Sequence, residues 1–118
     1  PLVGPSSILL ALMASGMNGQ NFAFHGYLPI DKTERKKKLA HLEAESAKTG
    51  VAQIFMETPY RNNQMVDDLT KILRAETKIC VACHITLEDE DIRTLSIKEW
   101  KNEKYDFHKR PAIFVMQA

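Results

Sequence analysis

The segment from residue 57 to residue 63 holds the densest group of side chains able to bind a ligand. It reads Glu-Thr-Pro-Tyr-Arg-Asn-Asn and lies between a predicted strand and a predicted helix. Backbone N–H groups and the dipole at a helix start favour anions. Arg61 can hold a phosphate or carboxylate through two parallel hydrogen bonds, and Tyr60 can stack on a base or ring. We therefore predict a ligand-facing turn; the alternative is a capped, solvated helix start.

His84 is a second candidate because it directly follows a strand predicted for residues 78–83. In open α/β sheets, ligands gather beyond the carboxyl ends of the strands. The four histidines lie in different kinds of predicted element, and no His-rich metal motif occurs. We expect no metal site.

Two cysteines, Cys80 and Cys83, have the spacing of a redox pair. A redox-active pair needs a helix N-terminus to lower the thiol pKa, whereas both of these lie within a predicted strand. Residues three apart in a strand point to opposite faces of the sheet. We therefore expect two small buried side chains without a redox role.

Basic residues gather at position 32 and from 35 to 38, with a second patch at 108–110. Such a run is either the solvated face of a helix or a contact for RNA, and both interpretations stay open. The chain has 16 basic and 15 acidic residues, and this net charge of +1 neither requires nor excludes a nucleic-acid partner.

Strands and helices are predicted to alternate along the chain. Strands are expected at residues 22–28, 51–56, 78–83, 91–95 and 111–116, and helices at 8–15, 31–48, from Thr58 onward and 96–103. Thr58 is the expected N-cap with Pro59 at the first helical position, and Ser96 with Glu99 has capping-box spacing. This alternation predicts an α/β fold with helices on both faces, and the short connection before the strand at 91–95 predicts that its five-stranded sheet is mixed rather than all parallel.

The predicted helix at residues 8–15 is apolar nearly all the way round, so it needs burial on more than one side. A neighbouring domain or a second copy of the chain would supply that burial, which predicts a homodimer as one outcome. No apolar run approaches the roughly 20 residues of a membrane span, so no membrane partner is expected. Two cysteines and no recognisable secretory leader predict a cytoplasmic protein.

Three stretches of the sequence carry a family resemblance. They are Pro1-Leu-Val-Gly-Pro-Ser-Ser7, Phe24-His-Gly-Tyr-Leu-Pro29 and Ile54-Phe-Met-Glu-Thr-Pro-Tyr-Arg-Asn62. With Cys80-Val-Ala-Cys83 and residues 109–115, they make the chain resemble the tetrapyrrole methylase superfamily, and within it the branch of ribosomal small-subunit methyltransferase I. The Glu57–Arg61 block is specific for that branch, whereas the opening motif is shared by the whole superfamily.

The resemblance implies two α/β domains with S-adenosylmethionine in the cleft between them. It implies that residues 1–17 form a bridging helix from an N-terminal domain outside this sequence, and that residues 18–118 form the C-terminal domain. The chain would then be part of an S-adenosylmethionine-dependent methyltransferase, inactive by itself. Branch members methylate the 2′-hydroxyl of a cytidine in small-subunit ribosomal RNA. The resemblance therefore implies two partners: ribosomal RNA or the small subunit, and the N-terminal domain outside this sequence.

The resemblance also assigns residues to the two ligands. It implies cofactor contacts at Ser6, Ser7, Met56, Glu57, His84, Ile85 and Gln117. With the turn described above, it implies substrate contacts at Thr58, Tyr60, Arg61 and Asn62. No catalytic base is identified. Two alternatives remain open: a fragment of a corrin or porphyrin methyltransferase, and a non-catalytic binding or oligomerisation module.

Overall fold

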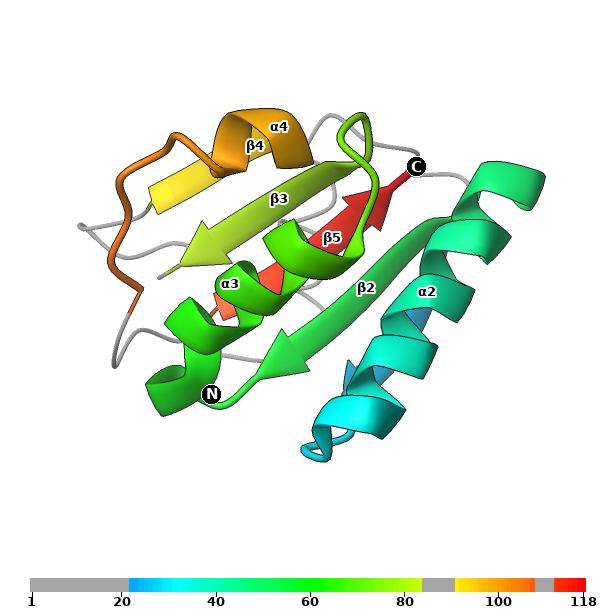
Figure 1. The fold of residues 1–118 in the computed structure, drawn as a ribbon, viewed down its shortest axis with the longest axis horizontal. Helices are drawn as coiled ribbons and strands as arrows, with labels where there is room; N and C mark the ends of the chain where they lie inside the picture. The colour runs from blue at the N-terminus through cyan, green and yellow to red at the C-terminus, as the bar shows by residue number, and fades with distance from the viewer. Residues whose placement is uncertain (1–21, 84–90, 108–111) are drawn as a thin grey trace.

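The computed structural model describes residues 22–83, 91–107 and 112–118 of the 118-residue chain (Figure 1). Strands and helices alternate through most of this part, as the sequence predicts. The elements in chain order are β1 (Phe22–Tyr27), α2 (Lys32–Thr49), β2 (Ala52–Glu57), the 3-10 helix η1 (Pro59–Arg61), α3 (Asn62–Ile72), β3 (Lys78–Cys83), β4 (Asp91–Ser96), α4 (Ile97–Trp100) and β5 (Ala112–Gln117). None of the described helices is both long and apolar enough to cross a membrane.

The five strands form one mixed sheet in the order β1-β2-β5-β3-β4. Strand β1 is parallel to β2, while β5 runs antiparallel to both β2 and β3, and β4 is antiparallel to β3. The carboxyl ends of β1, β2 and β3 therefore share one edge, which we call the carboxyl edge. There, Glu57 and Cys83 flank Ala112, the first residue of β5. The prediction of a mixed five-stranded sheet is confirmed.

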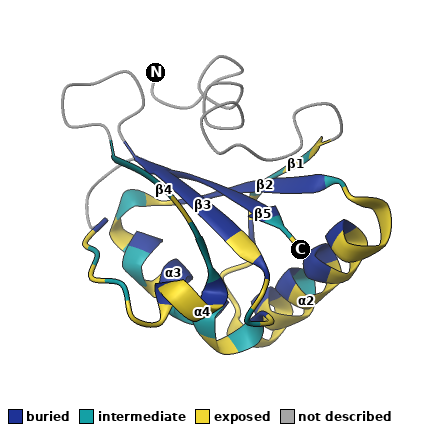
Figure 2. Cartoon of the chain, turned by 90° about the horizontal axis from the view of Figure 1, so that it is seen from above, coloured by how far each residue is buried: buried dark blue, intermediate teal, exposed yellow. Residues whose placement is uncertain are grey.

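The sheet has two faces with different coverings. All three described α-helices lie on the same side, which we call the helix face (Figure 2). Phe55 and Phe114 stack there at 5.5 Å between ring centroids. The opposite side, the second face, carries its own buried cluster, including Ile54 and Val115. The predicted helix at residues 8–15 falls outside the described residues, so helices on both faces remain a prediction.

Local signals set the two ends of α2. The Asp31 carboxylate accepts a hydrogen bond of 2.9 Å from the Glu34 N–H, satisfying a donor that a helix start leaves unpaired. At the other end, Gly50 adopts a left-handed φ of 76°, and its N–H donates to the Ser46 carbonyl at 2.8 Å. The helix predicted at 31–48 is confirmed within one residue at each end.

The helix start predicted at Thr58 is confirmed in position but not in detail. Thr58 is the N-cap residue and Pro59 the first residue of η1, but Thr58 makes no side-chain capping bond, and α3 itself begins only at Asn62. The cause is Glu57, whose Oε1 accepts the Thr58 N–H at 2.8 Å and lies 3.5 Å from the Thr58 hydroxyl. That hydroxyl donates to the carboxylate instead of accepting from the helix.

Two further local predictions are confirmed, the capping box and the burial of the cysteines, whereas the helix predicted at 96–103 is shorter, α4 spanning Ile97–Trp100. Ser96 and Glu99 form a reciprocal capping box at the start of α4. Cys80 and Cys83 are both buried and unoxidised, and they belong to the clusters of opposite sheet faces. Burial raises the pKa of the Cys80 thiol, partly offset by a hydrogen bond with Thr94. A thiol of raised pKa is a poor nucleophile.

Candidate ligand-binding site

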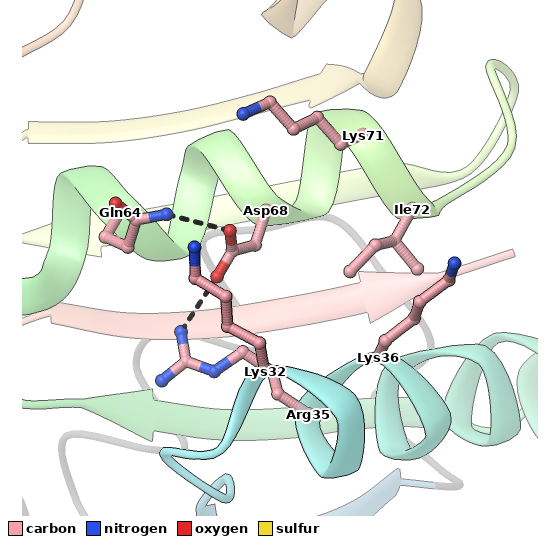
Figure 3. Close-up of a pocket in the computed structure, with 7 residues that line it drawn as sticks. All are labelled: Lys32, Arg35, Lys36, Gln64, Asp68, Lys71 and Ile72. Atoms are coloured by element: carbon pink, nitrogen blue, oxygen red, sulfur yellow. Dashed lines mark hydrogen bonds and ion pairs between the residues drawn. The ribbon is translucent and has the colours of Figure 1, made fainter.

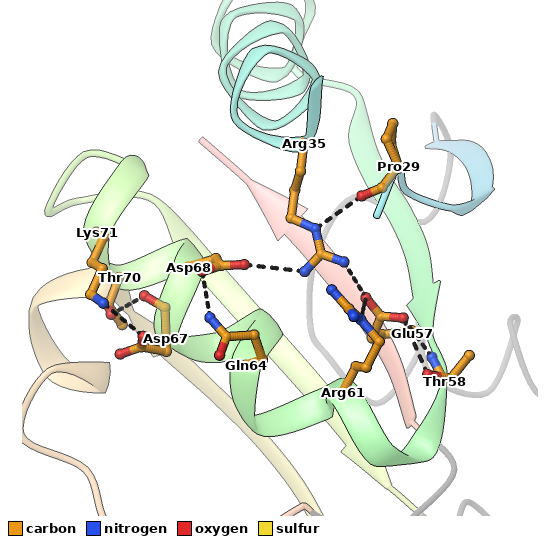
Figure 4. Close-up of polar contacts among 10 residues, drawn as sticks. All are labelled: Pro29, Arg35, Glu57, Thr58, Arg61, Gln64, Asp67, Asp68, Thr70 and Lys71. Atoms are coloured by element: carbon orange, nitrogen blue, oxygen red, sulfur yellow. Dashed lines mark hydrogen bonds and ion pairs between the residues drawn. The ribbon is translucent and has the colours of Figure 1, made fainter. Parts of the chain in front are cut away.

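The carboxylate of Glu57 is the centre of the polar network at the carboxyl edge (Figure 4). Its side chain is only 5% exposed and points to the helix face, on the same side of β2 as Phe55. Oε2 accepts a hydrogen bond of 2.6 Å from Nη2 of Arg35, and Oε1 accepts the Thr58 N–H. The direction of the chain as it leaves β2 is thereby fixed by the Glu57 side chain.

Arg35 links three separate parts of the chain. Its Nε donates to the Pro29 carbonyl at 3.0 Å, and its Nη1 donates to Oδ2 of Asp68 at 3.1 Å. With Glu57, these contacts join the segment after β1, the end of β2 and the middle of α3. Arg35 is 1% exposed, so the interpretation of residues 35–38 as uniformly solvated or RNA-facing is wrong at this position.

Arg61 approaches the same carboxylate from the turn. Its Nε lies 3.6 Å from Oε2 of Glu57, and its side chain is 36% exposed. Two guanidinium groups, Arg35 and Arg61, thus face two carboxylates, Glu57 and Asp68, and the formal charges cancel. Since Arg35 holds Glu57 by the shorter contact, the exposed part of the Arg61 guanidinium can still donate to an anion.

The other residues of the turn divide between inside and outside. Asn62 is fully buried, and its Nδ2 donates to the Phe107 carbonyl at 3.1 Å, which ties the turn to the segment before β5. Thr58 is exposed, and Tyr60 is 68% exposed. The outward-facing part of the turn therefore consists of Thr58, Tyr60 and Arg61. A substrate contact by Asn62 stays a prediction, because its described contact is structural.

The sequence is similar to part of several known enzymes, although no protein-family model matches it. It is 34% identical over 99 residues to the ribosomal RNA small subunit methyltransferase I of Vibrio cholerae, covering 84% of this chain and 33% of that protein. The protein of the same name from Bacillus subtilis is 35% identical over 106 residues, 87% of this chain and 35% of that protein. The Haemophilus influenzae protein is 32% identical over the whole chain and 41% of its own length. The chain thus spans about a third to two fifths of these relatives.

Solved structures share the architecture at low sequence identity. The methyltransferase CobJ matches 93% of this chain and 46% of its own with a TM-score of 0.60 and 15% identity. A putative diphthine synthase from Entamoeba histolytica matches 95% and 51% with a TM-score of 0.65 and 14% identity. The cobalt precorrin-4 methyltransferase CbiF matches 94% and 48%, with a TM-score of 0.58 and 13% identity.

The chain has a tetrapyrrole methylase-like fold. The resemblance noted in the sequence is therefore confirmed, and we refer to the chain as the methylase-like domain. Its homologues are methyltransferases, of which it corresponds to a part.

The described cofactor candidates of the methylase-like domain do not lie together. Met56 is the neighbour of Glu57 in β2, so its side chain points to the second face, where it is 8% exposed. Gln117 ends β5, which runs antiparallel to β2, so it lies at the opposite edge of the sheet. The six residues from Ala112 to Gln117 span roughly 17 Å of strand. There, Nε2 of Gln117 donates to the Gly50 carbonyl at 3.0 Å. The structure does not bring Gln117 to Met56.

The other four cofactor candidates, Ser6, Ser7, His84 and Ile85, lie outside the described residues and stay predictions. Within the described ranges, no group of three or more His, Cys, Asp or Glu side chains is arranged to hold a metal ion.

Sequence reasoning missed Arg35 and Asp68 because both look like ordinary charges on helix surfaces. A signal for Arg35 was present: it precedes Leu39 by four positions and Leu42 by seven, which places all three on one helical stripe. A cation on an apolar stripe needs a buried carboxylate, and Glu57 at a strand end supplies it.

Proposed function

We propose that the methylase-like domain is part of an S-adenosylmethionine-dependent methyltransferase that acts on small-subunit ribosomal RNA, at the 2′-hydroxyl of a cytidine. The supporting observation is the set of relatives named ribosomal RNA small subunit methyltransferase I, which align with between 73% and 100% of this chain. Because the chain spans less than half of each, the proposed activity belongs to a longer protein that contains it.

Two local features support this role. Met56 is an apolar residue at the carboxyl edge, 8% exposed, and a side chain of this type suits the floor of an adenosine site. Tyr60 and Arg61 offer a ring and a cation at the outer side of the turn, which suits a base and a phosphate. S-adenosylmethionine would supply the methyl group.

The expected contribution of this domain is positioning. Methyl transfer needs the acceptor oxygen, the methyl carbon and the sulfonium in line, and correct alignment alone lowers the barrier by several kcal/mol, up to roughly 10. The buried pair of Arg35 and Glu57 holds the turn in one conformation, so Tyr60 and Arg61 are presented on a fixed framework. Arg61 remains protonated and is suited to anchoring, not to removing a proton.

The test uses the full-length protein containing this sequence, with methyl-labelled S-adenosylmethionine and small ribosomal subunits as acceptor. We expect label in the ribosomal RNA at a nucleotide that becomes resistant to alkaline cleavage, since a 2′-O-methyl group blocks that reaction. A precorrin is offered in parallel. Label in the precorrin alone would replace the proposal by a tetrapyrrole methyltransferase, and absence of both labelling and cofactor binding would favour a non-catalytic module.

The chain offers a matched control for Arg61. Arg61 and Arg74 each place Nε 3.6 Å from a glutamate oxygen, Glu57 and Glu43 respectively, but only Arg61 lies on the turn. A charge-assisted hydrogen bond to substrate contributes about 1.5–3 kcal/mol, so Arg61→Gln should lower kcat/KM about tenfold to a hundredfold. Arg74→Gln should leave kcat/KM unchanged. Equal effects of the two variants would remove Arg61 from the site.

A further inference from the structure

A groove of about 220 Å³ lies between α2 and α3 on the helix face (Figure 3). The exposed side chains of Lys32 and Lys36 on α2, and of Lys71 on α3, lie around it, with Gln64 toward its other end. Its volume is below the 300 Å³ or more of typical small-molecule pockets. An open groove of this size suits part of an extended chain better than an enclosed ligand.

The charge of the groove favours an anion. Its lining contains four cationic side chains and one carboxylate, that of Asp68. Two of the cations are already paired, Arg35 with Glu57 and Asp68, and Lys71 with Asp67 at 2.9 Å, which leaves Lys32 and Lys36. The Asp68 carboxylate is already occupied, because Oδ2 accepts from Arg35 at 3.1 Å and Oδ1 accepts from Gln64 at 2.8 Å. Among the described residues, Lys32 and Lys36 have no ion-pair partner.

The groove and the candidate site share one residue, Arg35. Helix α2 begins just after β1, and α3 begins directly after the turn that presents Tyr60 and Arg61. Arg35 contributes to both places, since it lines the groove and binds Glu57 at the root of the turn. The groove therefore neighbours the turn, at a place where the backbone of a bound chain could contact both.

We propose that this groove binds phosphate groups of the RNA backbone through Lys32 and Lys36. The inference rests on the proposed function and deepens it, because it separates the basic residues of α2 by role. Arg35 belongs to the buried framework, Lys32 and Lys36 contact phosphates, and Lys37, which does not line the groove, makes no contribution.

The experiment compares two double variants of the full-length protein with equal charge loss on the same helix. Lys32→Gln/Lys36→Gln removes the groove lysines, and Lys37→Gln/Lys48→Gln removes two exposed lysines that do not line it. The Kd for purified small-subunit ribosomal RNA is measured over a range of KCl concentrations. We expect the groove variant to lower the slope of log K against log salt by about 2, one for each lost phosphate contact, and the control to retain the wild-type slope.

Kinetics give a second readout. Because binding of the backbone is equally strong in the ground and transition states, the groove variant should raise KM for the small subunit and leave kcat unchanged. Equal slopes for the two double variants would show a diffuse basic field and overturn the proposal. The proposal would also be overturned if the groove variant lost binding of inorganic phosphate but kept the wild-type affinity for RNA, because the groove would then be a site for a small anion.

Failure of the inference is distinguishable from failure of the proposed function. A wild-type protein that methylates the subunit but whose RNA affinity is insensitive to Lys32 and Lys36 refutes only the groove. A wild-type protein that neither binds nor methylates this RNA refutes both.

Discussion

Replacement of Arg35 by methionine is the most informative test of the framework at the carboxyl edge. Methionine matches the aliphatic stem of the arginine side chain and lacks the guanidinium. Three acceptors then each lose one donor: Glu57 at 2.6 Å, Asp68 at 3.1 Å and the Pro29 carbonyl at 3.0 Å. Gln64 still donates to Asp68, and Thr58 to Glu57.

The burial of each acceptor determines the size of the loss. The Glu57 side chain is 5% exposed, whereas that of Asp68 is 16% exposed and better reached by water. Breaking a buried ion pair from one side costs about 3–5 kcal/mol when the remaining charge is left uncompensated. Here Arg61 stays 3.6 Å from Oε2 of Glu57 and offsets part of that cost. We therefore expect Arg35→Met to lower the free energy of unfolding by about 3 kcal/mol, the low end of that range, which is a large share of the roughly 5–15 kcal/mol typical of a domain.

Urea unfolding followed by tryptophan fluorescence measures this loss. The chain has a single tryptophan, Trp100, whose indole is buried and donates to the Ile79 carbonyl at 3.0 Å, so its emission reports the folded core. The control is Lys36→Met, at the adjacent exposed position, which should change the free energy of unfolding by no more than about 0.5 kcal/mol. Glu57→Gln combined with Arg35→Met should cost less than the sum of the single changes, since the two residues are in contact. Equal costs for Arg35→Met and Lys36→Met would refute this account of the framework.

Three further predictions concern local features. Gly50→Ala should lower the free energy of unfolding by about 1–2 kcal/mol, because a φ of 76° is strained for any residue with a Cβ. No atom lies within 4 Å of the added methyl, so the loss would come from the backbone and not from a clash; an unchanged urea midpoint would contradict this. Cys80 should resist iodoacetamide at pH 8 in the folded chain and react on unfolding, since burial raises its thiol pKa; rapid labelling without unfolding would show that the thiol is accessible. Hydrogen bonds with Ser96 lower the pKa of Glu99 below its ordinary 4.5. The stabilisation from the Glu99 carboxylate should therefore be present above pH 4.5 and be lost as the pH falls through the lower pKa of the folded state. An NMR titration that gives Glu99 a pKa at or above 4.5 would be inconsistent with the capping box.

Elements whose limits depend on neighbouring residues were predictable from the sequence. The Asp31 cap and Gly50 define α2, and the capping box defines α4, because each signal acts within four residues of chain. The alternation of strands and helices likewise predicted the α/β sheet, and the short connection before the strand at 91–95 predicted that it is mixed. The strand order was not predictable, since β5 inserts between β2 and β3 through pairings of residues far apart in sequence. No local preference encodes such a choice.

The candidate site was predictable in position and only partly in orientation. The turn after β2 does lie at the carboxyl edge, as the strand-end argument requires. Adjacent residues of a strand point to opposite faces, however, so Met56 and Glu57 cannot both face the same ligand with their side chains. The sequence shows this alternation but not which face is covered by helices, and that covering determines the burial of Glu57.

The motifs that carry the family resemblance turn out to be physical partners. The motif from Phe24 to Pro29 and the motif from Ile54 to Asn62 are separated by the whole of α2, yet Arg35 within that helix binds the Pro29 carbonyl and the Glu57 carboxylate. Within them, Pro29 and Glu57 are thus constrained by a structural contact. A resemblance at such positions identifies the structural framework reliably, but it says less about which substrate accepts the methyl group. Discrimination between RNA and another substrate must come from side chains that the framework leaves outward, Tyr60 and Arg61 above all, and these are where substrate assays carry the most information.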